Sequence, residues 1–283
     1  MSVYLETNAL RKLVDYSCDE PVCTSIFAIF ELISGISKED FNIRKACLKR
    51  IKESKIEVRI PMVDRLFMEL VGETDYNQFA HEMIFDVFKS VIVAEDFSQI
   101  ENLQLAITDF DGKDKSINAL EWLKKWDSSI ANITKNIAPL FENEDRKFIV
   151  YLYNKDGIRG LADYYWNKFF CNRIDENRIQ HAEGFIGSDN VEKLRKEQDE
   201  LFERYNFKLF ISAQAAVFSK AYFINGNTQD ANNAGDLLHL LYLRRGDKYV
   251  SNDKIYKQIA EACPEFNLVT ISNEKYLKED KAV

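Results

Sequence analysis

The sequence predicts an α/β protein in which a small parallel sheet is flanked by helices in three layers and carries a large, mainly helical insertion. Short apolar runs alternate with helical patterns near both ends of the 283-residue chain. This alternation is typical of parallel strands joined by crossover helices. Helical periodicity dominates the middle of the chain. We therefore expect one discontinuous domain, with a core at about 1–63 and 223–283 and an insertion at about 64–222.

The first 63 residues predict two strands and two helices. Residues 2–5 form a short apolar run that ends at polar residues, as a buried strand does. A helical pattern follows over 7–14. Residues 23–25 are suited to begin a second helix, whose apolar residues recur at helical spacing over 26–34. The apolar stretch 56–63 predicts the second strand.

Two helices of the insertion have distinct patterns. Apolar residues from Ile117 to Ile137 recur every three or four positions, which predicts a long amphipathic helix. A more polar helix is expected over about 190–205. No repeat of fixed period is visible, so the insertion is not predicted to be a solenoid.

The C-terminal part of the chain returns to the alternation of the first part. Turn-forming residues fill 225–235, and an apolar helix is expected over 236–245. Short strands are expected at 248–251 and 267–272, with a helix between them. The crossover rule places these strands in the same parallel sheet as the N-terminal ones.

Composition narrows the class of protein. With 46% hydrophobic and 30% charged residues, the chain is expected to be globular. The net charge of −8 argues against general coating of nucleic acid but permits a local basic groove.

The five cysteines show no C-x-x-C spacing, so reduced thiols are expected and a zinc site is not. With neither a secretory signal nor a membrane-length apolar run, we expect a cytoplasmic protein that does not enter membranes.

Two carboxylates of the N-terminal part lie where a charge is unusual. Glu6 directly follows the first predicted strand, and ligands of open α/β folds bind at the carboxyl ends of strands. Glu31 lies within the apolar stretch 27–33, where an ionised carboxylate is costly unless it is paired. Either residue has an ordinary alternative: a solvated acid for Glu6 and a salt bridge for Glu31.

Two further acids lie in the C-terminal part. Asp236 begins an apolar helix, where it could equally serve as a cap. Asp253 follows the strand at 248–251, where an Asn-Asp turn is the alternative. A parallel sheet would bring all four acids to one edge. Clustered acids repel one another unless a cation neutralises them, and hard oxygen ligands favour Mg²⁺ or Mn²⁺.

These segments resemble the PIN-like domains, a family of metal-dependent nucleases. In that family the first strand usually ends in Asp-x-Asn, and here Glu6-Thr7-Asn8 follows 3-VYL-5. The family's later acids match Glu31 within 25-SIFAIFEL-32, Asp236 within 235-GDLLHL-240 and Asp253 within 250-VSNDK-254. The resemblance covers about 1–63 and 233–272, and residues 64–222 have no counterpart in a minimal PIN domain.

The resemblance implies a nuclease that uses these four carboxylates as metal ligands and leaves a 5′-phosphate and a 3′-hydroxyl. RNA is the expected substrate, although the sequence leaves DNA open. One departure matters, because Glu6 replaces the usual Asp and extends the carboxylate by about 1.5 Å. A displacement of that size is enough to weaken a metal site.

Several other residues have candidate roles. Asn8 would orient a ligand carboxylate or cap the first helix. Lys254, Arg244 and Arg245 would contact flanking phosphates, unless they belong to a solvated surface. His239 lies one turn beyond Asp236, and we interpret it as a packed core histidine. Trp122, Trp126 and Trp166 could stack bases, with helix packing as the alternative for the first two.

Three alternatives to an active nuclease remain at the level of sequence. A weakened PIN-like domain could bind nucleic acid or protein without cutting. A protein whose helical insertion binds an inhibitor, another partner or a second copy of the chain would use the core as a scaffold. A phosphohydrolase of another acid-rich α/β type is less well supported, because no Asp-x-Asp pair follows the first strand.

Overall fold

A five-stranded parallel sheet lies at the centre of the computed structural model, which describes residues 2–13, 19–63, 65–66, 79–108, 114–135, 141–168, 207–226, 233–244 and 246–272. Its strand order is β3-β2-β1-β6-β7, and every neighbouring pair is parallel. The strands are β1 (Val3–Leu5), β2 (Val22–Ser25), β3 (Glu57–Arg59), β6 (Lys248–Val250) and β7 (Val269–Ile271). The predicted α/β class and its parallel sheet are therefore confirmed.

Strand β1 is the middle strand and joins the two ends of the chain. Leu5 is paired with Val250 of β6, and Tyr4 with Cys23 of β2. The stacked rings of Tyr4 and Tyr249 are fully buried, with centroids 5.4 Å apart. Because the strands are parallel and in register, the residues that follow β1, β2 and β6 emerge at the same edge of the sheet.

The prediction missed strand β2. Residues 23–25 were expected to begin a helix, but Val22–Ser25 is a strand that runs directly into α2 (Ile26–Ser34). Ser25 both ends the strand and caps the helix, because its hydroxyl accepts a hydrogen bond from the Ala28 N–H at 3.1 Å. The predicted strand at 56–63 is shorter than expected, since β3 ends at Arg59, two residues before Pro61, which has no N–H to donate.

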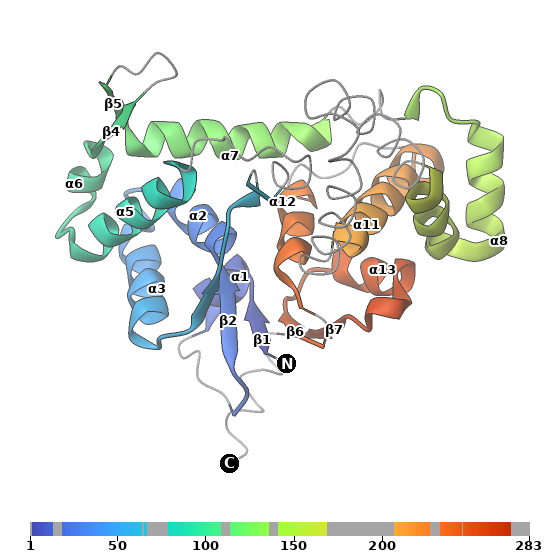
Figure 1. The fold of residues 1–283 in the computed structure, drawn as a ribbon, viewed down its shortest axis with the longest axis horizontal. Helices are drawn as coiled ribbons and strands as arrows, with labels where there is room; N and C mark the ends of the chain where they lie inside the picture. The colour runs from blue at the N-terminus through green and yellow to red at the C-terminus, as the bar shows by residue number, and fades with distance from the viewer. Residues whose placement is uncertain are drawn as a thin grey trace, which may run out of the picture.

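Helices cover the sheet in two groups (Figure 1). The first group contains α1 (Thr7–Lys12), α2, α3 (Phe41–Glu53) and α5 (Phe79–Val93), and α2 packs against the other three. The second contains α8 (Arg146–Tyr165), α11 (Phe207–Ser219), α12 (Asn233–Leu238) and α13 (Ile255–Ala262), and α11 packs against the other three. The first group is built mainly from the N-terminal half of the chain and the second mainly from the C-terminal half.

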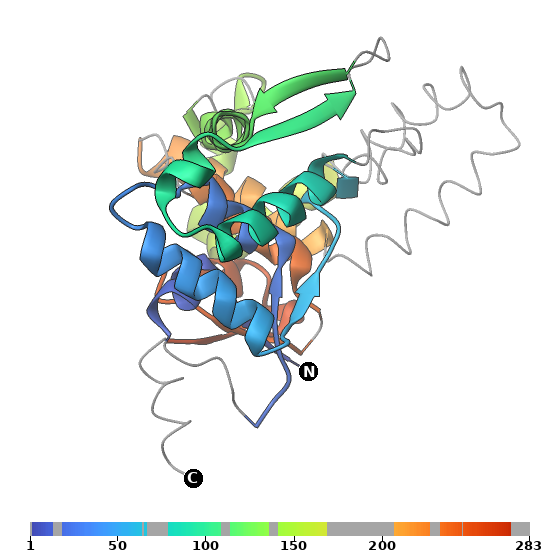
Figure 2. The same ribbon diagram turned by 90° about the vertical axis from the view of Figure 1, so that its left-hand side faces the viewer.

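Helices predominate among the described residues of the range 64–222, and this part of the chain also contains a β-hairpin. Strands β4 (Gln104–Thr108) and β5 (Asp114–Asn118) pair antiparallel and project away from the five-stranded sheet (Figure 2). The long amphipathic helix is α7 (Ala119–Lys135). Ile117 was expected in this helix but belongs to β5. The polar helix predicted at 190–205 lies outside the described residues.

Helix α7 bridges the two groups of helices. It packs against α2 of the first group and against α12 of the second (Figure 1). Short α6 (Phe97–Glu101) and the hairpin lie at its N-terminal end. Helix α7 therefore lies along the edge where the carboxyl ends of the strands emerge.

The C-terminal segments largely follow the prediction. The helix expected over 236–245 begins earlier, as α12, and continues as the 3₁₀ helix η5 (His239–Tyr242). The π-helical turn η4 (Lys220–Ile224) continues α11, and the 3₁₀ turn η6 (Pro264–Phe266) precedes β7. Strands β6 and β7 lie at the predicted positions.

A buried ion pair ties β3 to the turn before β6. Arg59 donates to Asp247 and, at 2.6 Å, to the Tyr242 carbonyl oxygen. Asp247 also accepts hydrogen bonds from the backbone N–H groups of Ser2 at 2.9 Å and Arg244 at 2.7 Å. One carboxylate therefore anchors the start of β1, the turn before β6 and the edge strand β3.

Two further expectations concern compartment and thiols. None of the described helices is both long enough and apolar enough to cross a membrane. Cys23, Cys47 and Cys263 are buried free thiols. The remaining two cysteines, at 18 and 171, lie outside the described residues.

Candidate functional site

All four acids singled out in the sequence line one cavity of about 370 Å³ at the carboxyl edge of the sheet. Glu6 follows β1, Glu31 lies in α2, Asp236 lies in α12 and Asp253 follows β6. These positions come from both ends of the chain, and the parallel sheet together with the helices packed on it brings them together. The predicted gathering of carboxylates at one edge is therefore observed.

Glu6 is buried, with an exposed fraction of 3%, and serves as the N-cap of α1. Its Oε2 accepts a hydrogen bond from the Asn8 N–H at 2.9 Å, whereas its Oε1 has no hydrogen-bond partner among the described residues. Burial raises the pKa of Glu6, against the lowering effects of His239, the Asn8 N–H and the nearby Ser251 hydroxyl. A buried carboxylate oxygen without a partner is unusual and is consistent with a ligand position.

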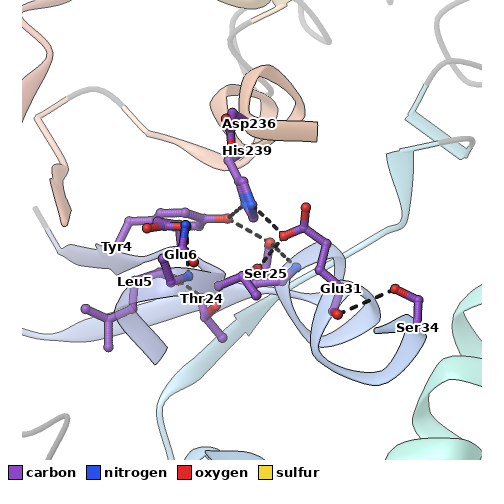
Figure 3. Close-up of polar contacts among 12 residues, drawn as sticks. Tyr4, Leu5, Glu6, Thr24, Ser25, Glu31, Ser34, Asp236 and His239 are labelled. Atoms are coloured by element: carbon purple, nitrogen blue, oxygen red, sulfur yellow. Dashed lines mark hydrogen bonds and ion pairs between the residues drawn. The ribbon is translucent and has the colours of Figure 1, made fainter. Parts of the chain in front are cut away.

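Glu31 is held in place by two side chains, of which His239 is seen in Figure 3. Its Oε2 accepts a hydrogen bond from the Thr7 hydroxyl and lies 2.9 Å from Nε2 of His239. The other ring nitrogen of His239 lies 2.8 Å from the Tyr4 hydroxyl, which donates to Ser25 at 2.7 Å. This buried chain of contacts joins β1, β2, α2 and η5 directly behind the carboxylates.

The His239 ring carries more positive character than an ordinary histidine. Burial lowers its pKa, but the hydrogen-bonded Glu31 carboxylate, Glu6 and Asp236 together outweigh burial, so the pKa is raised. When the ring is protonated, both of its N–H groups donate, one to Glu31 and one to Tyr4. His239 is packed in the core, as interpreted from the sequence, and it also contacts the site.

Gly235 allows α12 to approach Glu31 closely. A Cβ atom at Gly235 would lie only 3.2 Å from Oε1 of Glu31. A larger residue would therefore push the carboxylate out of its present position. The preference for glycine here arises from close approach and is visible only in three dimensions.

The pKa of the Asp236 carboxyl group is strongly raised. Burial, followed by the negative charge of Asp253 and then of Glu31 and Glu6, raises its pKa to about 8, against the opposing effect of His239. At neutral pH and without a bound cation, Asp236 therefore tends to hold a proton. The carboxylates at this edge are close enough to repel one another, as the sequence predicted for a charge cluster.

Asp253 is exposed and also shapes the start of α13. Its Oδ1 accepts a hydrogen bond from the Ile255 N–H at 3.1 Å, and its own N–H donates to Ser251 at 3.1 Å. The turn alternative raised by the sequence is therefore observed, and Asp253 lines the cavity as well. The two roles do not conflict, because Oδ2 has no part in the hydrogen bond to Ile255.

Sequence reasoning missed a fifth carboxylate, Asp127, which reaches the cavity from α7 of the insertion. It is accessible to solvent, but the surrounding protein still raises its pKa, and Glu31 raises it further. The available signal was a charge on the apolar stripe of a helix, four residues after Leu123 and three before Ile130. That stripe faces the core, so an acid on it merited the same attention as Glu31.

The cations at the cavity also differ from those expected. Arg11 of α1 and Arg44 of α3 line the cavity. Arg44 donates to the carbonyl oxygens of Glu31 at 3.1 Å and Leu32 at 3.0 Å, and so holds the C-terminal end of α2. Arg11 is exposed.

The predicted phosphate contacts lie elsewhere or outside the described residues. Arg244 forms an exposed ion pair with Glu57 at 2.9 Å and is not among the residues that line the cavity. Lys254 is exposed at the start of α13 and is not among them either, and Arg245 lies outside the described residues.

The two expected roles of Asn8 have different outcomes. Asn8 is exposed and lines the cavity, but the side chain that caps α1 belongs to Glu6. The capping alternative is therefore wrong for Asn8. The expectation that it orients a ligand carboxylate stays a prediction.

The tryptophans of α7 pack against other aromatic rings. Trp126 contacts Phe30 with ring centroids 4.9 Å apart and Trp122 with centroids 5.2 Å apart. This agrees with the helix-packing alternative for Trp122 and Trp126. The Trp166 ring lies under the ammonium group of Lys208, at 5.5 Å from its centroid.

The donor set of this site is that of a hard divalent cation, but the side chains do not converge on one point. Carboxylate oxygens are the ligands that Mg²⁺ and Mn²⁺ prefer. However, no group of three or more His, Cys, Asp or Glu side chains among the described residues is arranged to hold a metal ion. A cation here would need water-mediated ligands or a small inward rotation of the carboxylates.

Comparison of the chain with protein families, with curated proteins and with solved structures gave no match. The assignment of a function therefore depends on the geometry and electrostatics of the cavity.

Proposed function

We propose that this protein is a divalent-metal-dependent nuclease of the PIN-like type, which hydrolyses phosphodiester bonds, with RNA as the expected substrate. The observation that carries the proposal is the gathering of Glu6, Glu31, Asp236 and Asp253 around one cavity at the carboxyl edge of a parallel sheet. The sequence resemblance named these four residues independently of the fold.

The electrostatics of the cavity support a cation site. The pKa of Asp236 is raised to about 8 partly by neighbouring carboxylates, and the pKa of Glu6 is also raised. Oε1 of Glu6 is buried without a partner among the described residues. A cation would neutralise this excess of negative charge and supply the missing partner.

Mg²⁺ or Mn²⁺ would be held by Glu6, Glu31, Asp236 and Asp253, some through water, and would supply Lewis acidity toward a phosphate and toward a bound water. The protein's own groups orient the ligands. Thr7 and His239 fix the Glu31 carboxylate, and Asp236 would release its proton as the cation binds.

The decisive experiment is calorimetric titration of Mn²⁺ into the wild type and Asp253→Asn, followed by incubation with labelled single-stranded RNA and DNA. Asp86→Asn is a matched control, because Asp86 is an exposed acid on α5 that pairs with Lys89. We expect Asp253→Asn to weaken Mn²⁺ binding about 10- to 100-fold and to abolish cleavage, with Asp86→Asn unchanged. Absence of Mn²⁺ binding and of cleavage in the wild type would refute the proposal.

One observation favours a weakened, non-cutting relative as the second candidate. Glu6 is extended by one methylene relative to the usual Asp, and its carboxylate is engaged as the cap of α1. If only the Glu6→Asp variant cleaves nucleic acid, the natural protein is this weakened form, which binds nucleic acid or a partner protein without cutting. A wild-type cleavage activity equal to or greater than that of Glu6→Asp would exclude this second candidate.

A further inference from the structure

Helix α7 of the insertion forms one wall of the carboxylate cavity. It packs against α2, which carries Glu31, and against α12, which carries Asp236. Its residues Asp127, Ile130 and Ala131 line the cavity. They are spaced three and four positions apart and therefore lie on one face of the helix. The site is thus bounded by the insertion as well as by the core.

Asp127 lies at the margin of the acid cluster. The charges that shift its pKa are those of Glu31, which raises it, and Arg44, which lowers it. Glu31 also acts on Asp236, together with Asp253, Glu6 and His239. Asp127 differs from the four proposed ligands in its origin, because it reaches the cavity from α7 and not from a strand end, α2 or α12.

The chemistry of the α7 wall suits a nucleoside and not a phosphate. An ionised carboxylate only accepts hydrogen bonds, and a phosphodiester has no donor to offer and carries the same sign of charge. Ribose hydroxyls and base N–H groups are donors. Ile130 is buried and Ala131 half-buried, so they offer an apolar surface for a sugar or base to pack against.

The cavity volume of about 370 Å³ lies within the range of sites that hold one small molecule. A nucleotide of a duplex would have to be turned out of the helix to enter such a site. Proteins that read RNA in this way act on unpaired nucleotides. A single-stranded substrate is therefore favoured.

On the basis of the proposed nuclease function, we propose that α7 is the nucleoside-binding wall of the site. Asp127 accepts a hydrogen bond from a ribose hydroxyl or a base N–H of one unpaired nucleotide, while Ile130 and Ala131 pack against that nucleotide. The insertion then determines which nucleic-acid strands are bound, and the sheet-edge acids of the core act on the phosphodiester.

The test compares Asp127→Ala with Glu121→Ala, a matched control at an exposed acid of the same helix that does not line the cavity. Alanine favours helix at both positions, so both variants should fold. We expect Asp127→Ala to raise KM for a short single-stranded RNA about tenfold, while Glu121→Ala and the Mn²⁺ affinity of both variants stay unchanged.

A second variant tests the wall without removing charge. Ala131→Leu adds three carbon atoms to the cavity lining, so we expect a higher KM for the RNA with unchanged Mn²⁺ affinity.

Parallel assays on RNA and DNA of the same sequence identify the group of the nucleotide that donates to Asp127. A defect of Asp127→Ala on RNA alone indicates a ribose hydroxyl, and an equal defect on both indicates a base.

Three outcomes would overturn the inference. The first is a KM of Asp127→Ala equal to that of Glu121→Ala. The second is a loss of Mn²⁺ affinity in Asp127→Ala as large as in Asp253→Asn, which would make Asp127 a metal ligand. If the wild type binds no Mn²⁺ and cuts nothing, the nuclease function fails, and calorimetry with nucleoside 5′-monophosphates decides the inference alone. If the nucleoside monophosphates bind equally to the wild type and to Asp127→Ala, or bind to neither, the inference is refuted.

Discussion

At the scale of single residues, the cavity depends on close contacts around one carboxylate. Glu31 is fixed by Thr7 and His239 on one side and limited by Gly235 on the other. A displacement of about 1 Å at a catalytic group can reduce a rate about 100-fold. Small changes at these neighbours should therefore affect function more than folding.

Gly235→Ala separates these two effects. A Cβ atom 3.2 Å from Oε1 of Glu31 must displace the carboxylate by a few tenths of an ångström. In contrast, alanine within a helix is favoured over glycine by up to about 1 kcal/mol. We expect unchanged or higher stability in urea unfolding together with weaker Mn²⁺ binding in calorimetry. A variant that binds Mn²⁺ like the wild type would show that Glu31 can adjust freely.

The acids of the cavity predict an unusual dependence of stability on pH. The folded-state pKa of Asp236 is about 8, above its ordinary value of 3.8, so between these values the folded state binds more protons than the unfolded state. Stability then falls as pH rises through this window. The raised pKa values of Glu6, Asp127 and His239 act in the same direction.

In buffer that contains a metal chelator, we therefore expect the free energy of unfolding to decrease between about pH 4 and pH 8. Asp236→Asn removes one of these protonations and should flatten the profile. Added Mn²⁺ should restore stability at the alkaline end by binding the folded state. Urea unfolding across this pH range, with and without Mn²⁺, measures all three effects. A wild-type profile that rises toward pH 8 would contradict the electrostatic picture.

At the scale of helices and strands, the sequence identified those elements whose pattern is local. The strands at 3–5 and 248–250 were found from apolar runs that end in polar residues, and Glu6 and Asp253 were found because they follow those strands. Strand β2 was missed because its three consecutive buried residues, which run straight into a helix, leave no alternation to detect.

The fifth carboxylate was missed for a different reason. The amphipathic pattern of α7 shows that one face of the helix is buried, but it does not show against what. Only the packing of α7 on α2 and α12 places Asp127 in the cavity. Contacts between an insertion and its core depend on residues far apart in sequence, which periodicity cannot reveal.

The buried pair of Arg59 and Asp247 should be the most important polar contact between strands in the described part of the sheet. Asp247→Asn leaves the buried guanidinium with only the more exposed Glu57 carboxylate, 3.8 Å from its Nε, as a counterion among the described residues. Nε and Nη2 of Arg59 already lack hydrogen-bond partners among those residues. We expect a loss of about 3–5 kcal/mol in unfolding free energy.

The control for this prediction is Asp86→Asn, which breaks an exposed pair with Lys89 and should cost less than about 1 kcal/mol. Chemical denaturation of the two variants side by side gives the comparison. Similar losses in both would show that the buried pair has no special weight in the stability of the sheet.

At the scale of the whole molecule, α7 couples the insertion to the core through aromatic packing. Trp126 contacts Phe30, the residue before Glu31, so the wall of the cavity and one of its carboxylates share a contact. Neither the core nor the insertion defines the cavity alone. Changes in this contact should therefore be transmitted to the site.

Trp126→Ala should loosen the wall. Because Trp126 is half-buried, we expect a loss of about 2 kcal/mol, below the 3–5 kcal/mol of a fully buried aromatic side chain. Amide hydrogen exchange in α7 should accelerate, while exchange in β1 and β6 should change little. Lys124→Ala, on the exposed side of α7, is the control. Unchanged exchange in α7 of Trp126→Ala would show that other contacts hold this helix.

The order of the strands also has a consequence for biosynthesis. The middle strand β1 is made first, but its neighbour β6 lies at residues 248–250, and Asp253 follows it. At about 5–20 residues per second, translation from residue 6 to residue 253 takes on the order of tens of seconds. Throughout that time the nascent chain lacks part of its acid cluster. A protein with the function proposed above would therefore be unable to cut the messenger from which it is being translated until β6 and Asp253 have been made.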